Sequence, residues 1–320
     1  MKPSVLAGLA AGAAIPACGV YLLYRREMAA ARARVEAVDR HIVPTPWGAV
    51  EYVDRGTGAP LLVVHGIFHN CVGGLLSIRD LFPDRRIIAP SRFGYLGSTM
   101  PPNATPAAQA DAFVALLDAL DIAQTDVVGL SAGATSVLQL ALRHPGRVKR
   151  LALLVGNLPG SPTAIVQPSW TRRINWQFVM WALKTFAPSR MLRLVAAVPK
   201  EFAICGDDAR IVNQFIESLF PMSRAGYDFD LFVSNADVTS YNLEAISVPS
   251  LIAHTKDDQL ASHDASRRAA ERIPGARFVS LASGGHLMLG QQENGRKELA
   301  RFFAHLHSEP SAINSGHRTR

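Results

Sequence analysis

Short, continuously apolar runs recur along the chain, and stretches with the spacing of amphipathic helices separate them. Apolar runs of this length are typical of strands buried on both faces, and parallel strands are usually joined by crossover helices. The alternation therefore predicts an α/β fold, in which a mostly parallel sheet is flanked by helices. The expected strands are residues 61–65, 85–90, 125–130, 148–156, 250–254 and 276–282.

One long segment interrupts this alternation. Residues 161–245 hold tryptophan and phenylalanine in helix-like stretches with no clear strand, so we expect a helical cap inserted over the sheet. The α/β core then consists of residues 41–160 and 246–306. The polar residues 307–320 are expected to form a disordered tail.

The N-terminus contains a long uncharged run. Residues 4–24 carry no charge, and at roughly 1.5 Å per residue they would form a helix of about 30 Å, the thickness of a bilayer core. We therefore expect a single-pass membrane anchor at residues 1–26 and a helical stalk at 27–40. The arginines that follow the run favour a cytoplasmic location for the rest of the chain. A cleaved signal peptide, or a lipoprotein signal ending at Cys18, is the alternative.

The composition excludes several classes of protein. Apolar residues make up 48% of the chain and charged residues 18%, which is ordinary for a globular protein and argues against disorder. The net charge of +7 comes from the N-terminal flank and scattered arginines, without a basic stripe, so nucleic acid is not an expected partner. The three cysteines lack metal-ligand spacing, and neither a metal nor another cofactor is expected. Nothing in the sequence indicates the oligomeric state.

The strongest chemical signal is the string DVVGLSAGA at residues 126–134. It follows an expected strand, leads into an alanine-rich helix and contains the pattern Gly-x-Ser-x-Gly around Ser131. Small residues on both sides of a serine allow a sharp, strained turn that presents the hydroxyl above the sheet edge. Ser131 is therefore a candidate nucleophile.

A serine hydroxyl needs a base to take its proton and a carboxylate to orient that base. His286 is the best-placed histidine, because it lies in a glycine-rich loop after the last expected strand and can overhang the same sheet edge as Ser131. Asp257 and Asp258 both follow the preceding strand, at residues 250–254. The spacing alone leaves the choice between these two acids open.

An acyl-transfer intermediate also needs hydrogen-bond donors for its oxyanion. The backbone N–H of Ala132 follows the candidate nucleophile and can supply one donor. The second is expected from the loop after residues 61–65, where Ile67 is the first choice and Phe68 the second. The side chain of His65 is expected to brace this loop.

These residues resemble the α/β-hydrolase fold superfamily, specifically the single-domain hydrolases with a helical cap. The resemblance covers about residues 40–306 and rests on residues 64–66, 89–98 and 129–133 together with the late Asp258 and His286. The chain order Ser, Asp, His is that of this family, and its late-strand pattern implies Asp258 as the acid.

Two features of the sequence narrow the resemblance. Ser131 stands where dehalogenases and epoxide hydrolases of this superfamily carry a nucleophilic aspartate, so neither activity is expected. The loop after Gly66 lacks the glycine-rich extension of lipases and of carbon–carbon bond hydrolases. Ser91 stands where family members usually have aspartate, a position that shapes the fold more than the chemistry.

The resemblance implies a serine hydrolase of ester-type bonds with a catalytic triad of Ser131, His286 and Asp258, and the uncharged N-terminal run adds the expectation that this hydrolase is anchored to a membrane. Its partner would be a small-molecule ester or acyl substrate. The aromatic side chains of the cap either line a pocket for a lipophilic acyl group or simply pack the cap onto the core, and the sequence leaves both interpretations open. Two alternatives stay open. One is acyltransferase or haloperoxidase-like activity on the same triad, and the other is a non-catalytic, membrane-tethered binding protein of the same fold.

Overall fold

The computed structural model describes residues 3–304 of the chain. The tail expected at residues 307–320 lies outside the described residues, as do the first two residues of the expected anchor.

An eight-stranded sheet with the order β1-β2-β4-β3-β5-β6-β7-β8 forms the centre of the molecule. Strands β3 to β8 run parallel to one another, whereas β2 is antiparallel to both β1 and β4. The predicted α/β class with a mostly parallel sheet is therefore confirmed. The strands are β1 (His41–Thr45), β2 (Gly48–Arg55), β3 (Pro60–Val64), β4 (Arg86–Pro90), β5 (Thr125–Leu130), β6 (Val148–Leu154), β7 (Ser250–Thr255) and β8 (Arg277–Leu281).

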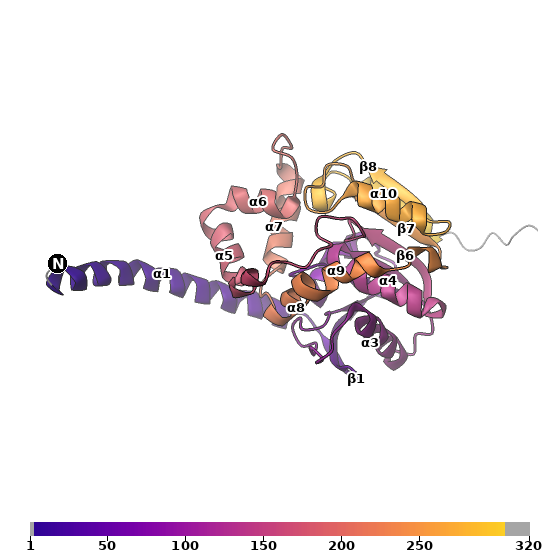
Figure 1. Ribbon diagram of the computed structural model, residues 1–320, viewed down its shortest axis with the longest axis horizontal. Coiled ribbons are helices and arrows are strands. Elements are labelled where there is room, and N and C mark those ends of the chain that lie inside the picture. Colours follow the sequence, from indigo (N-terminus) through magenta and orange to yellow (C-terminus); the bar gives the residue numbers. More distant parts are fainter. Residues whose placement is uncertain (1–2, 305–320) are drawn as a thin grey trace, which may run out of the picture.

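Helices cover both faces of this sheet (Figure 1). Successive residues of β3 show why, because Leu62 and Val64 pack into one apolar cluster and Leu61 and Val63 into another. Side chains alternate between the two faces of a strand, so a fully apolar strand needs cover on both sides. One cluster takes side chains from α3 (Pro106–Ala119), α4 (Ala134–Arg143) and α10 (His263–Arg272), and the other from α2 (Cys71–Ile78) and α11 (Gln292–Ala304).

A third apolar cluster lies in a group of helices beside the sheet (Figure 1). These helices come from the segment in which the sequence showed no strand, and we call α5 to α8 the cap. They are α5 (Trp176–Phe186), α6 (Pro188–Ala196), α7 (Gly206–Ser218) and α8 (Arg224–Phe229). A π-helical turn (Asp230–Ser234) and the short α9 (Asn235–Asp237) follow directly. The remaining 3₁₀ turns are Arg79–Leu81, Ser131–Gly133, Pro145–Arg147, Ser169–Arg173, Val238–Ser240, Leu243–Ala245 and Gly285–Leu287.

The N-terminal helix α1 (Pro3–Glu36) corrects the predicted membrane anchor and the cytoplasmic location derived from it. No helix within the described part of the chain combines the length and the apolar character that crossing a bilayer requires. One continuous helix runs through Arg25 and Arg26, and in its second half Met28 and Ala31 are buried in the apolar cluster of the cap. Apolar side chains of this half pack against protein.

Polar contacts join the second half of α1 to the cap. Lys184 of α5 forms an ion pair with Glu27 at 2.6 Å, and Arg34 pairs with Glu217 of α7 at 2.8 Å. The Tyr24 ring meets Trp181 edge-on, with centroids 5.1 Å apart. This half of α1 is therefore packed as an element of the folded domain.

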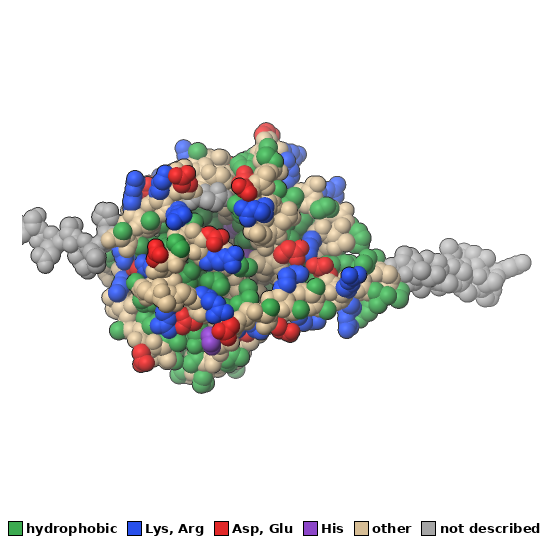
Figure 2. Space-filling view, turned by 180° about the vertical axis from the view of Figure 1, so that it is seen from behind, with side chains coloured by type: hydrophobic (Ala, Val, Ile, Leu, Met, Phe, Trp, Pro, Cys, Tyr) green, Lys and Arg blue, Asp and Glu red, His purple; other side chains and the backbone are tan. Residues whose placement is uncertain are grey.

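Charges of both signs lie side by side on the surface. On the face turned away from the view of Figure 1, lysine and arginine side chains alternate with aspartate and glutamate (Figure 2). The positive side chains therefore do not form one continuous basic patch on that face.

Candidate active site

The chain makes a sharp turn at the carboxyl end of β5, where Ser131 begins a 3₁₀ turn that leads into α4. Its φ of +49° lies in the left-handed region that residues with a side chain rarely adopt. The flanking glycines make this turn possible. A Cβ on Gly129 would lie 2.4 Å from a methyl group of Val137, and a Cβ on Gly133 would lie 2.4 Å from the carbonyl oxygen of Val64.

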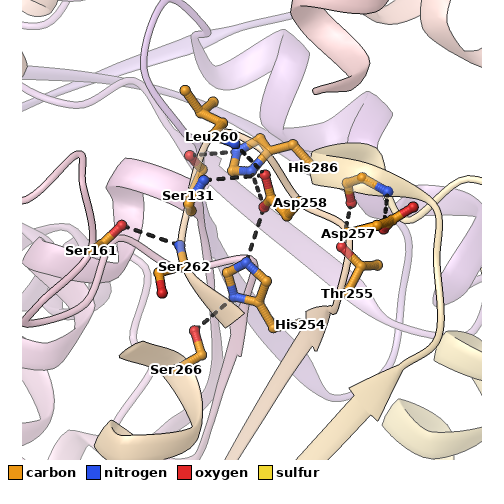
Figure 3. A network of polar contacts seen from close by, with 12 residues as sticks. Ser131, Ser161, His254, Thr255, Asp257, Asp258, Leu260, Ser262, Ser266 and His286 are labelled. Atoms are coloured by element: carbon orange, nitrogen blue, oxygen red, sulfur yellow. Dashed lines mark hydrogen bonds and ion pairs between the residues drawn. The ribbon is translucent and has the colours of Figure 1, made fainter. Parts of the chain in front are cut away.

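Three predicted site residues meet above the carboxyl ends of the strands (Figure 3). Ser131 follows β5, Asp258 follows β7, and His286 lies in the 3₁₀ turn after β8. His286 Nε2 is 2.9 Å from Ser131 Oγ, and His286 Nδ1 is 2.7 Å from Asp258 Oδ2. Since a carboxylate can only accept, Nδ1 carries the hydrogen and Nε2 presents its lone pair to the serine hydroxyl.

The Asp258 carboxylate is fully buried. Its Oδ1 accepts hydrogen bonds from the backbone N–H groups of Leu260, at 2.8 Å, and Ala261, at 3.1 Å. Burial raises the pKa of Asp258, but the electrostatic interaction with His286 and the hydrogen bonds from His254 and His286 outweigh burial and hold that pKa below the ordinary carboxyl range. Asp258 is therefore ionised at neutral pH.

Asp257 has a different set of partners. Its two carboxylate oxygens accept from the backbone N–H groups of Gly284, at 3.0 Å, and Gly285, at 2.9 Å. Gly285 has a φ of +59°, and a Cβ there would lie 2.2 Å from the carbonyl oxygen of Ala196 in the cap. Asp257 thus holds the backbone of the loop that carries His286, and the contact with the imidazole belongs to Asp258.

The predicted oxyanion donors lie in two places: Ala132 follows the serine in its turn, and Ile67 follows Gly66, which lies close to Ser131. Ala132 is the second residue of a helical turn, where its N–H has no intrahelical acceptor. Among the described residues none accepts a hydrogen bond from the Ile67 N–H, whereas the Phe68 N–H donates to the Tyr95 hydroxyl at 3.2 Å. Of the two loop amides considered from the sequence, Ile67 is the one available to a substrate. Its role stays a prediction.

The side chain of His65 holds the loop of residues 65–70 in place. Its Nε2 accepts from the Arg92 backbone N–H at 3.0 Å, so Nδ1 donates to the Gly66 carbonyl oxygen at 2.7 Å. Burial lowers the pKa of His65 well below its ordinary value, which keeps the ring neutral in these two contacts. The loop presses against the nucleophile, since a Cβ on Gly66 would lie 3.0 Å from Ser131 Cβ.

A buried ion pair that the sequence did not predict joins the core to the segment that follows the cap. Arg92, in the loop after β4, binds Asp230, the first residue of the π-helical turn that follows α8, through two hydrogen bonds of 2.6 and 2.5 Å, and both side chains are fully buried. The Tyr95 hydroxyl donates to Asp230 at 2.5 Å and accepts from Phe68. The cap is thereby connected to the loop that carries the predicted oxyanion donor. Nothing in the local pattern around Asp230 signals this contact.

His254, the fifth residue of β7, is a further residue of the site that the sequence did not predict. Its Nε2 lies 3.0 Å from Asp258 Oδ2, the same oxygen that binds His286. The one available signal was an ionisable residue directly after the apolar centre of this strand. Among the described residues no cluster of His, Cys, Asp and Glu could hold a metal ion.

A family model and related sequences assign the chain to the same family. A family model described as alpha/beta hydrolase fold matches residues 59–292. The chain is 30% identical to 2-hydroxymuconate semialdehyde hydrolase of Pseudomonas putida over 270 residues, which cover 82% of this chain and 92% of that protein.

Solved structures show the same architecture. An alpha/beta hydrolase fold protein from Nakamurella multipartita superposes with a TM-score of 0.67 at 25% identity, over 82% of this chain and 98% of the other. A thermophilic esterase from Thermogutta terrifontis superposes with a TM-score of 0.63 at 21% identity, over 83% of this chain and 98% of the other.

Proposed function

The chain belongs to the α/β-hydrolase fold family, and from this premise we propose that it is a serine hydrolase of ester-type bonds in small molecules. The relatives named above are hydrolases and an esterase, so the class of enzyme is that of the family. The proposal adds the bond type and assigns the roles of Ser131, His286 and Asp258.

One observation carries the proposal, namely the continuous line from Ser131 Oγ through His286 to Asp258, with contacts of 2.9 and 2.7 Å. In the first step His286 Nε2 takes the hydroxyl proton while Ser131 Oγ attacks the carbonyl carbon. Asp258 stabilises the resulting imidazolium. The negative charge on the carbonyl oxygen is met by the N–H groups of Ile67 and Ala132.

The second half of the reaction uses the same groups. His286 gives its proton to the departing alkoxide, which leaves an acyl group on Ser131. His286 then takes a proton from a water molecule as that water attacks the acyl carbon. Collapse of this second intermediate releases the acid, and the proton returns to Ser131.

A second candidate substrate follows from one relative. The 30% identity to 2-hydroxymuconate semialdehyde hydrolase favours a substrate of the kind named for that enzyme, turned over by the same three residues. Parallel assays with 2-hydroxymuconate semialdehyde and with p-nitrophenyl esters of graded chain length decide between the candidates, because the preferred substrate has the higher kcat/KM.

A fluorophosphonate probe tests the proposed nucleophile. We expect the probe to label the wild-type protein and the Ser131→Ala variant to remain unlabelled and inactive on the esters. The control is Ser169→Ala, which removes an exposed serine hydroxyl and should leave labelling intact. Folded wild-type protein that reacts with neither the probe nor the esters contradicts the proposal.

A further inference from the structure

Two imidazoles share one oxygen of the Asp258 carboxylate (Figure 3). His286 contacts Oδ2 from the side of the nucleophile, at 2.7 Å, and His254 contacts it from β7, at 3.0 Å. The reaction proposed above uses only His286. The side chain of His254 is fully buried and is therefore not exposed to a substrate that arrives from solvent.

The contacts of His254 fix its ring in one orientation. Its Nε2 faces an ionised carboxylate and must carry the hydrogen of that bond. Its Nδ1 lies 2.7 Å from the hydroxyl of Ser266, on α10. In the neutral ring Nδ1 accepts from this hydroxyl, so helix α10 sets the angle at which His254 donates to Asp258.

The two oxygens of Asp258 differ in how they are held. Backbone N–H groups of Leu260 and Ala261 bind Oδ1, and within residues 3–304 the two imidazoles are the partners of Oδ2. Without His254, the one partner of Oδ2 would be His286, the ring that the carboxylate has to orient. His254 gives Oδ2 a fixed partner that takes no part in proton transfer.

We propose that His254 and Ser266 form a positioning pair that holds Asp258 in the orientation required by His286. The proposal rests on the proposed function, in which Asp258 orients the base. A carboxylate held in this way keeps its direction while His286 gains and loses a proton during turnover. The pair should therefore affect kcat more than KM, since the orientation of the base matters in the transition state.

The test compares His254→Leu with His254→Gln in the hydrolysis of p-nitrophenyl butyrate. Leucine removes the donor to Oδ2, whereas the amide of glutamine can still donate. We expect kcat of His254→Leu to fall about 10- to 100-fold, the effect of losing a hydrogen bond to a charged group, with KM nearly unchanged. His254→Gln should recover most of this loss. Thermal unfolding of both variants reports any general loss of stability.

The matched control is His263→Leu. His263 lies next to His254, with ring centroids 6.3 Å apart, but its Nε2 contacts Ser280 at 2.9 Å and it does not bind Asp258. This variant should keep the kcat of the wild type. A purely structural role of His254 would lower kcat of the Leu and Gln variants in parallel with their thermal stability.

The outcomes separate this inference from the proposed function. If wild type hydrolyses the ester, Ser131→Ala does not, and His254→Leu keeps full kcat, the positioning pair is overturned and the proposed function stands. Equal loss in the Leu and Gln variants at equal stability also overturns it. If Ser131→Ala is as active as wild type, the proposed function fails, and the positioning pair fails with it.

Discussion

Asp257 and Asp258 are consecutive residues, yet their carboxylates hold different parts of the same loop. Asp258 contacts the ring of His286, and Asp257 binds the backbone N–H groups of the two glycines that precede His286. Both acids lie in the turn that follows β7. One of them positions the side chain of the base, and the other positions the main chain that precedes the base.

This division predicts unequal effects of the same substitution at the two positions. Asp258→Asn presents an amide to Nδ1 or leaves the ring in the wrong tautomer, and kcat/KM for p-nitrophenyl butyrate should fall about a thousandfold or more. Asp257→Asn keeps one acceptor for the loop and should lose far less activity. Equal losses, or a greater loss in Asp257→Asn, would show that the wrong carboxylate has been assigned.

Gly133 offers a test of the turn that carries the nucleophile. Gly133→Ala would force a methyl group to 2.4 Å from the carbonyl oxygen of Val64, and the unfolding free energy should fall on the order of 3 kcal/mol. Gly146→Ala is the control, because a Cβ at Gly146 meets nothing within 4 Å. Urea unfolding measures both variants. An unchanged midpoint for Gly133→Ala would mean that β3 can move away from the turn.

His69 predicts a dependence of stability on pH. It lies in the loop after β3, contacts the hydroxyl of Ser218 at 3.0 Å and packs on the ring of Phe215, both in α7. Burial lowers the pKa of His69 to about 4. As the pH falls, His69 of the unfolded chain is protonated near the ordinary histidine pKa of about 6.5, whereas His69 of the folded protein stays neutral until the pH is much lower.

The sign follows from this difference. The contribution of a neutral His69 is complete above about pH 6.5 and is lost as the pH falls toward 4, by up to about 3 kcal/mol. His69→Phe keeps the aromatic packing and removes the titrating group, so its unfolding free energy should change less between pH 7 and pH 5 than that of wild type. Identical pH profiles of the two proteins would refute this role for His69.

The sheet could be predicted because its signal is local. Residues 125–130 were expected as a strand and form β5 with those bounds, and the other five expected strands differ from the observed ones by at most two residues at either end. Apolar runs of this kind have few alternatives in a globular chain. The meeting of Ser131, Asp258 and His286 followed from the same signal, since parallel strands bring their carboxyl ends to one edge.

Contacts between distant segments could not be predicted from the sequence. Arg92 and Asp230 are 138 positions apart, and either residue alone resembles an ordinary surface charge. The contact of His254 could not be predicted either, because a polar residue within a buried strand usually serves packing. The apolar run before Arg25 led to the wrong prediction of a membrane anchor. Its length and hydropathy are those of a helix that could lie in lipid, and they do not reveal that the second half of the same helix packs on protein.

The packing of α1 also bears on how the protein should be produced for experiments. The region shared with the family begins at residue 59, whereas Met28 and Ala31 are part of the apolar cluster of the cap. An expression fragment trimmed to the shared region would leave the surface around Trp181 without the tyrosine ring that now lies against it. Cloning boundaries for this chain therefore have to follow the buried contacts of its first helix rather than the extent of its homology.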